Sequence, residues 1–229
     1  MIGDPVALTI RRRIKRPSPA LMRAFGNTPT GFITDAYNGK GCMNRHVKAI
    51  EQRMRFSGSA VTALCPPMDN LAAMAILDFV KTGDVIVLAT GGDETAGVIG
   101  DLWALRAKQL GVQAIVCDGL VRDVPGLLKV GLPVFARGWV PNSAFKNGPG
   151  EINLPVTCGG VAVQPGDVIA GDRDGVVVVP LAEAKGVAAQ LELVRRKERE
   201  TLALVSSGAP RKFWDEAGLK QRGAVRYVG

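Results

Sequence analysis

The stretch that decides the fold runs over residues 84–123 and reads DVIVLATGGDETAGVIGDLWALRAKQLGVQAIVCDGLVRD. Its apolar start, residues 84–90, predicts a buried strand, and a glycine-rich loop follows at residues 91–100. After a helical segment, residues 112–117 read as a second buried strand. Because a βαβ crossover makes its two strands parallel, the pattern predicts an α/β fold with a βαβ unit at residues 84–117.

The helix of this unit is expected to present one apolar side to the sheet. Gly111 is placed to end it, since glycine commonly follows the last helical turn. The positions expected to favour the apolar side are Ala96, Ile99, Leu102, Trp103, Leu105 and Leu110.

Three polar residues fall where the two strands end. Asp101 begins the helix that follows the first strand, and Arg122 and Asp123 follow the second. Loops after parallel strands lie on the same edge of a sheet, so two carboxylates and a guanidinium should meet there. The sequence therefore predicts a metal and carboxylate site. Taken singly, each part has a structural alternative: Asp101 as a helix cap, and the Arg122-Asp123 pair as a surface ion pair before a Pro125-Gly126 turn.

Composition narrows the class of protein. The chain has 229 residues with 47% hydrophobic content, enough to bury the core of one large domain. No apolar run approaches the ~18 residues of a membrane span, and the basic cluster near the N-terminus follows the apolar residues, the wrong order for a secretory signal. We expect a cytoplasmic protein.

Cysteine and histidine usage excludes several kinds of site. His46 is the single histidine, which excludes a zinc site with several histidine ligands. No CxxC spacing occurs, and reduced, mostly buried thiols are expected. The four cysteines are Cys42, Cys65, Cys117 and Cys158.

The formal net charge of +8 raises the question of nucleic-acid binding. Basic residues gather at residues 11–16 (RRRIKR) and 195–199 (RRKER). The second run alternates with glutamate on a long helix and is typical of a solvated face. The first has no interleaved aromatic residues for base stacking. We therefore expect no nucleic-acid partner, and a positive field that attracts small carboxylate anions explains the same charge.

The rest of the chain divides into three parts. An N-terminal helical extension (residues 1–29) has Ser18 and Pro19 as its helix-start signal. The main domain (residues 30–181) ends in a strand-rich half, and a C-terminal helix and tail occupy residues 182–229. Further strands are expected at residues 56–65, 134–137, 154–158, 161–163, 168–171 and 176–179, and further helices at 20–25, 30–37, 71–79 and 182–205.

At this point the chain resembles a known family. Asp101, followed after twenty residues by Arg122-Asp123, is similar to the signature of the class II pyruvate aldolases, which cleave 4-hydroxy-4-methyl-2-oxoglutarate and 4-carboxy-4-hydroxy-2-oxoadipate. The segments GDLWALRAKQLGVQAIVCDGLVRDV (100–124) and PGEINLPVTCGGVAVQPGDVIAGDRDGVVVVP (149–180) also resemble this family. It shares its fold with the regulator of ribonuclease activity A, and the resemblance implies a three-layer β/β/α sandwich of the swivelling-domain type.

The resemblance also implies a reaction and its cofactor. Cleavage of a 4-hydroxy-2-oxo acid leaves an enolate of pyruvate, and without a lysine imine a divalent cation, Mg²⁺ or Mn²⁺, must balance that charge. Asp123 is the expected direct metal ligand, with Asp101 acting through water as the proton carrier and Arg122 stabilising the reacting oxygen. The same chemistry would allow oxaloacetate decarboxylation, and a role in aromatic catabolism is implied. Backbone and side-chain contacts to substrate are expected at Gly100, Asp101, Leu102, Trp103 and Arg122.

Two alternatives stay open. The chain could be a non-catalytic regulator of a ribonuclease, although such a protein has no need for the Asp101 carboxylate. It could also be a related metal-dependent enzyme that acts on another oxo acid. The family implies a homotrimer, or a hexamer built from two trimers, and we expect the apolar residues of the tail to pack on a neighbouring subunit.

Overall fold

The computed structural model describes residues 6–208 and 212–228. The chain forms two compact units, Met1–Leu191 and Glu192–Gly229, and each is described by itself. Within the described residues, no helix combines the length and the apolarity that crossing a membrane requires.

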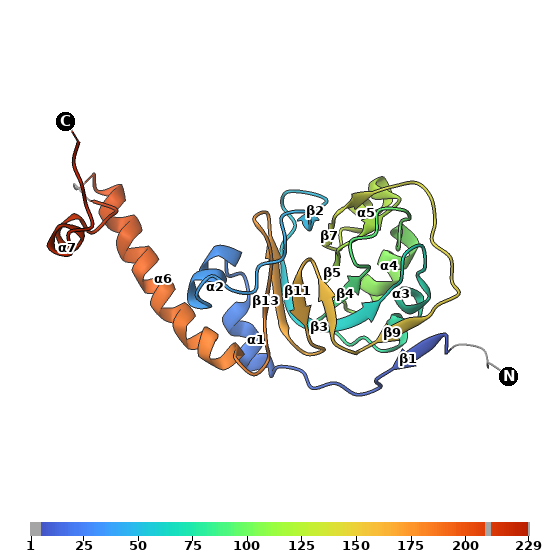
Figure 1. Cartoon of the computed structure of the whole chain (residues 1–229). Helices are drawn as coiled ribbons and strands as arrows, with labels where there is room; N and C mark the ends of the chain where they lie inside the picture. The colour runs from blue at the N-terminus through green and yellow to red at the C-terminus, as the bar shows by residue number, and fades with distance from the viewer. Residues whose placement is uncertain (1–5, 209–211, 229) are drawn as a thin grey trace. The chain divides into compact units, whose positions relative to one another are not determined.

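The first unit is built on one mixed sheet, shown in Figure 1. Its centre is the parallel series β3 (Phe56–Leu64), β4 (Asp84–Ala89), β5 (Ala114–Cys117) and β7 (Val134–Ala136). The order of the main path is β1-β9-β3-β4-β5-β7-β2. The outer strands are β1 (Leu8–Ile10), β9 (Gly150–Ile152) and β2 (Lys48–Ala49).

A second β layer covers one face of this sheet. The antiparallel hairpin of β12 (Val168–Asp172) and β13 (Gly175–Val179) joins the main sheet along β3. A second hairpin, β10 (Val156–Cys158) with β11 (Val161–Val163), packs on the same side. Its side chains form a core with every second residue of β4, namely Val85, Val87 and Ala89.

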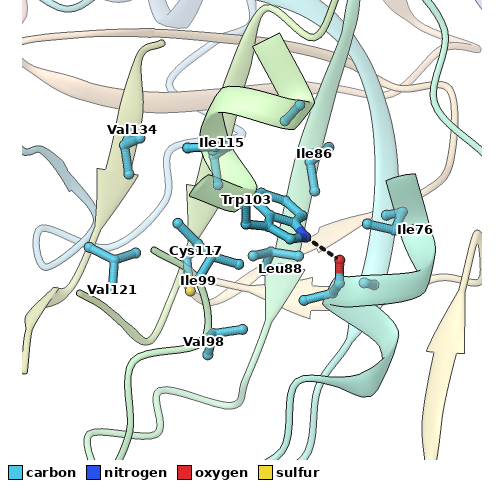
Figure 2. Packing of buried hydrophobic residues seen from close by; sticks show 14 of the residues in the cluster. Ile76, Ile86, Leu88, Val98, Ile99, Trp103, Ile115, Cys117, Val121 and Val134 are labelled. Carbon is cyan, nitrogen blue, oxygen red and sulfur yellow. Dashed lines mark hydrogen bonds between the residues drawn. The ribbon is translucent and has the colours of Figure 1, made fainter. Parts of the chain in front are cut away.

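Helices cover the other face. They are α3 (Leu71–Ala75), the short 3₁₀ helix η1 (Ile76–Asp78), α4 (Asp101–Gln109) and α5 (Val124–Val130). The alternate residues of β4, Ile86 and Leu88, face these helices and pack with Trp103 (Figure 2). The indole Nε1 of Trp103 donates a 2.9 Å hydrogen bond to the carbonyl of Ala73, which ties α4 to α3.

The three layers confirm the predicted β/β/α fold and its βαβ unit. The helix-start signal is also confirmed, because Ser18 caps α1 (Pro19–Phe25) through its hydroxyl and the N–H of Leu21. The helix α2 (Thr30–Ala36) begins against Asp172, which accepts from the backbone N–H and the hydroxyl of Thr30.

The prediction of the apolar side of α4 was wrong in part. Leu102 and Leu105 are 79% and 41% exposed, and Ala96 and Ile99 are buried in the loop before the helix. Trp103 packs on the sheet as predicted, together with Ala104 and Ala107 in place of the two leucines. Small alanines let the helix lie close to the strands, and leucines one position away then point outward.

The basic run at residues 11–16 contributes to the core rather than only to the surface. Arg16 forms two hydrogen bonds of 2.8 Å with Asp84, the first residue of β4, whose side chain is 1% exposed. This bidentate pair holds the N-terminal segment against the amino end of the parallel strands.

The helix α6 (Ala184–Ser206) begins in the first unit and continues into the second, which also contains α7 (Glu216–Gln221). In the second unit Glu216 accepts hydrogen bonds from Lys212, Lys220 and Tyr227, and those from the two lysines lower the pKa of Glu216 to about 2.

Two short strands of the first unit, β6 (Leu120–Val121) and β8 (Gly138–Trp139), pair with each other.

Candidate functional site

Backbone hydrogen bonds bring the loop after β4 and the loop after β5 into register. The N–H of Val98 donates to the carbonyl of Leu120 (2.9 Å), and the N–H of Arg122 donates to the carbonyl of Ile99 (3.0 Å). The N–H of Gly97 donates to the carbonyl of Asn142 (3.0 Å), so a third loop is fixed alongside. These bonds place the start of α4 next to the start of α5.

Asp101 is the first residue of α4, and Gly100 is its N-cap. The Asp101 Oδ1 accepts a 2.7 Å hydrogen bond from the N–H of Leu102. The Asp101 carboxylate therefore accepts from one of the N–H groups that have no partner within the first turn of α4. The carboxylate is half-buried.

Asp123 precedes α5 in an unusual conformation. Its φ is 59° and its ψ is 40°, the left-handed region that non-glycine residues seldom adopt, although Asp and Asn tolerate it best. The Asp123 side chain does not cap α5. Its Oδ2 accepts a 2.9 Å hydrogen bond from Arg122 Nε, and Arg122 also donates to the hydroxyl of Ser143. The strained backbone therefore carries a carboxylate that does not cap its own helix and lies against Gly100.

These side chains line a cavity of about 420 Å³. It is bounded by the start of α4, the Arg122-Asp123 pair, the N-terminal end of α3 and the loop that follows β8. Its lining residues are Asn70, Met74, Gly97, Val98, Ile99, Gly100, Asp101, Leu102, Trp103, Arg122, Asp123, Ser143, Ala144 and Lys146.

All six residues that the sequence singles out lie on this one cavity. The structural alternative for Arg122-Asp123 needs one correction, because Pro125 and Gly126 lie in the first turn of α5 and not in a turn after the pair. Glu94 pairs with Arg137 and is not among the lining residues. Asp172 accepts from the N–H of Asp174 and stabilises the turn between β12 and β13.

Three lining residues with polar side chains were not predicted: Asn70, Ser143 and Lys146. Ser143 and Lys146 belong to the Gly/Pro/Asn-rich stretch at residues 138–150, whose composition indicates an active-site or interface loop but does not single out either side chain. Asn70 donates from Nδ2 to the carbonyl of Val98 (2.8 Å), while its buried Oδ1 accepts no hydrogen bond within the described structure.

Lys146 bears on the choice between metal and imine chemistry. It is the lysine among the residues that line the cavity. The Lys146 side chain is exposed, whereas imine-forming lysines are usually desolvated or placed against another cation. Its position suits the binding of a carboxylate better than covalent catalysis.

The buried thiols do not offer a nucleophile. All four cysteines are free, as expected, and Cys42 is the exposed one. Burial raises the pKa of Cys65 to about 12, and it raises the pKa of Cys117 and of Cys158 above the ordinary thiol range as well. At neutral pH these groups are protonated and behave as small apolar side chains.

The donors on the cavity fit a small, hard cation. Asp101 and Asp123 supply carboxylate oxygens, and Mg²⁺ usually keeps several waters and takes only one or two protein carboxylates. A Cβ on Gly100 would lie 2.3 Å from Asp123 Oδ2, so the missing side chain leaves the room that this carboxylate occupies. Among the described residues no group of three or more His, Cys, Asp or Glu side chains is placed to hold a metal ion together.

Comparisons with known proteins agree with the fold. A protein of Halalkalibacterium halodurans with the provisional name 4-hydroxy-4-methyl-2-oxoglutarate aldolase is 35% identical over 176 residues, 77% of this chain and 82% of the relative. The crystal structure of an uncharacterized protein from Pseudomonas syringae matches with a TM-score of 0.77 and 27% identity, covering 86% of this chain and 92% of the other. The RNA-processing inhibitor RraA from Thermus thermophilis matches with a TM-score of 0.62 and 28% identity, covering 67% and 93%.

The family model described as RraA-like, Aldolase/RraA, matches residues 30–178, which include the whole βαβ unit and every residue of the predicted site. The chain belongs to the RraA-like family.

Proposed function

We propose that this protein is a divalent-metal-dependent aldolase that cleaves 4-hydroxy-2-oxo acids and releases pyruvate. The observation that carries the proposal is the meeting of Asp101, Arg122 and Asp123 on one cavity, beside the N-terminus of α4. The name of the Halalkalibacterium halodurans relative supports 4-hydroxy-4-methyl-2-oxoglutarate as the first substrate to test.

Each polar residue has a role that its chemistry suits. Asp101 takes the proton from the C4 hydroxyl through a water, the C3–C4 bond breaks, and its electron pair passes to the pyruvyl fragment as an enolate. Arg122 donates hydrogen bonds to the oxygen on which that charge develops. The proton that Asp101 holds then returns to C3, which completes pyruvate and leaves the carboxylate as it began.

Asp123 is the residue that would hold the cation directly, and Asp101 would act through a water. When bound, Mg²⁺ or Mn²⁺ supplies the positive charge that stabilises the anion formed on the pyruvyl fragment. Oxaloacetate has the same 2-oxo acid unit, with a carboxylate in place of the leaving ketone. We therefore expect decarboxylation, with CO₂ leaving in its place, as a second activity.

Lys146 offers a contact for the remainder of the substrate. The proposed substrates carry a second carboxylate beyond the pyruvyl group, and Lys146 lines the same cavity as Arg122. A second positively charged side chain in the cavity lining favours dicarboxylates over 4-hydroxy-2-oxo acids that lack the second carboxylate.

We also propose that the protein works as a homo-oligomer. Leu102, Trp139 and Phe145 belong to the segments that bound the cavity and are 79%, 63% and 61% exposed. Large apolar side chains gathered around a polar cavity are typical of an interface. A trimer or hexamer would cover them. Phe213, Trp214 and Tyr227 of the tail are exposed as well, and their packing on a neighbouring subunit stays a prediction. Light scattering at micromolar concentration that gives the mass of a monomer would exclude both.

The experiment that tests the function is an assay of pyruvate release. The full chain is incubated with 4-hydroxy-4-methyl-2-oxoglutarate and with oxaloacetate, in EDTA and then with Mg²⁺ or Mn²⁺ restored. We expect activity only with the metal. Borohydride added with substrate should leave the activity unchanged, because no imine forms. Trapping of a covalent adduct on Lys146 would instead support an imine mechanism.

The same assay separates the enzyme from a regulator. A protein that acts only by binding a ribonuclease would release no pyruvate from either substrate at any metal concentration. A related enzyme on another oxo acid would bind Mg²⁺ or Mn²⁺, measured by calorimetry, and would fail only on this pair of substrates.

A further inference from the structure

Gly126, in the first turn of α5, lies directly against Asp101, the first residue of α4. A Cβ built on Gly126 would be 2.1 Å from Asp101 Oδ2 and 2.6 Å from both Cβ and Cγ of Asp101. Real Cβ atoms do not approach other heavy atoms closer than 3.0 Å. The whole Asp101 side chain therefore occupies the space that any residue larger than glycine would need at position 126.

The backbone gives no other reason for a glycine here. Gly131, at the end of α5, has a φ of 68° and needs glycine for that left-handed conformation. Gly126 has no such positive φ and sits inside the helix, where alanine is the more favourable residue. The requirement is one of space, and the group that takes the space is the Asp101 carboxylate.

Rotation of the Asp101 side chain does not relieve this contact. A clash with Oδ2 alone could be removed by turning the carboxylate, but the Asp101 Cβ is attached to the backbone and is also too close. The carboxylate is held on its other side by the N–H of Leu102, 2.7 Å from Oδ1. An alanine at 126 would therefore push the start of α4 and the start of α5 apart.

We propose that Gly126 is a positioning residue, which sets the place of the Asp101 carboxylate by leaving room for it. The role in turnover rests on the proposed aldolase function, whereas the contact itself does not. Gly126 is not among the residues that line the cavity. It acts through Asp101, so its replacement should lower kcat, which depends on the placement of the proton carrier, more than it changes KM.

The contact is tested first by stability, without any assay of activity. Gly126→Ala should lower the Tm of the otherwise unchanged protein. In an Asp101→Gly background the same substitution should raise the Tm, because the obstructing side chain is gone and alanine favours the helix. Gly186→Ala is the matched control, since Gly186 lies in α6 with nothing within 4 Å of its built Cβ, and it should raise the Tm in both backgrounds.

Two results would overturn the contact. An increase in Tm for Gly126→Ala in both backgrounds would mean that no clash exists. An equal decrease in both would mean that the alanine meets something other than Asp101. Only a change of sign between the two backgrounds assigns the clash to that side chain.

The kinetic test measures pyruvate release with Mg²⁺ at a temperature where the variants are folded. Gly126→Ala should lose about tenfold to a hundredfold in kcat, with KM within about threefold of the starting protein. Gly186→Ala should keep both. A Gly126→Ala protein with full kcat would overturn the positioning role and leave the aldolase function standing. A starting protein without pyruvate release would instead sink the function and the role in turnover together, while the Tm reversal would still decide the contact.

Discussion

The two ends of the parallel strands each hold an arginine and an aspartate, and the two pairs are built differently. At the amino end, Arg16 and Asp84 share two hydrogen bonds of 2.8 Å, and Asp84 is 1% exposed. At the carboxyl end, Arg122 and Asp123 share one bond of 2.9 Å, and their side chains are 35% and 39% exposed.

The two carboxylates differ in how many of their hydrogen-bond acceptor positions are occupied by donors of the protein. Asp84 also accepts a 2.7 Å hydrogen bond from the N–H of Lys81, so both of its carboxylate oxygens have hydrogen-bond donors within the protein. Asp123 accepts from Arg122 on Oδ2, does not cap its own helix, and is presented from a left-handed backbone into a cavity. Removing one partner of a buried pair is destabilising, whereas an exposed carboxylate with free acceptor positions can bind a ligand.

The largest expected effect is the loss of turnover on Asp123→Asn. Asparagine keeps the size and tolerates the left-handed backbone, so only the charge and its ligand oxygen are lost. We expect kcat to fall more than about a thousandfold, or about 4 kcal/mol. The free energy of unfolding should change by less than about 1 kcal/mol, because the ion pair is exposed. Pyruvate release and urea unfolding measure the two quantities, and near-normal turnover would place the metal ligand elsewhere.

The same substitution at the other end should give the opposite result. Asp84→Asn removes the charge that Arg16 faces and presents an N–H₂ group to donors. We expect unfolding to become easier by about 3 kcal/mol, at the lower end for a broken buried pair because Arg16 stays partly solvated. The folded fraction should keep its kcat. If Asp84→Asn lowered kcat and Asp123→Asn lowered stability, the contrast between the two pairs would be mistaken.

Arg122→Lys sharpens the comparison at the carboxyl end. Lysine keeps the positive charge but loses the planar fork that reaches Asp123 and Ser143 together. A loss of about 2–4 kcal/mol in kcat/KM is expected, similar to that for removing a preorganised donor to a developing oxyanion. Stability should hardly change. Steady-state kinetics with both substrates gives the value, and a loss confined to KM would mean that Arg122 only binds the ground state.

Much of the fold could be read from the sequence because its strands are continuous apolar runs between clear turn signals. The strands β4 and β5 are buried on both faces, which such runs predict. The apolar side of α4 could not be predicted in the same way, since the sequence allows either its leucines or its alanines to form the face against the sheet. The sheet is packed by Ala104 and Ala107, and only close packing in three dimensions decides that. The helix expected at residues 71–79 breaks into α3 and η1.

The site divides along similar lines. Asp101, Arg122 and Asp123 could be placed together because the crossover rule puts the loops after parallel strands on one edge. Asn70 and Ser143 reach the cavity from segments far away in the sequence, through backbone bonds such as that from Gly97 to Asn142. Gly126 carries no side chain and therefore leaves no chemical signal in the sequence, although its absence of bulk determines where Asp101 lies.

The smallest expected effect is that of Ser143→Ala, which tests how much of the Arg122 geometry is imposed from outside the pair. Ser143 accepts a hydrogen bond from the Arg122 guanidinium while Asp123 accepts from Nε, so the two partners hold the fork from different sides. Without the hydroxyl, Arg122 keeps its charge and its bond to Asp123 but gains freedom to rotate. A loss of about 1 kcal/mol in kcat/KM is expected, below the usual value for a hydrogen bond to a charged group because water can replace an exposed hydroxyl. Ser143→Thr retains the hydroxyl and should recover most of that loss.

Because the effect of Ser143→Ala must work through Arg122, it should disappear in an Arg122→Lys background. If Ser143→Ala cost as much there as in the original protein, Ser143 would act on the substrate directly and not by orienting the guanidinium.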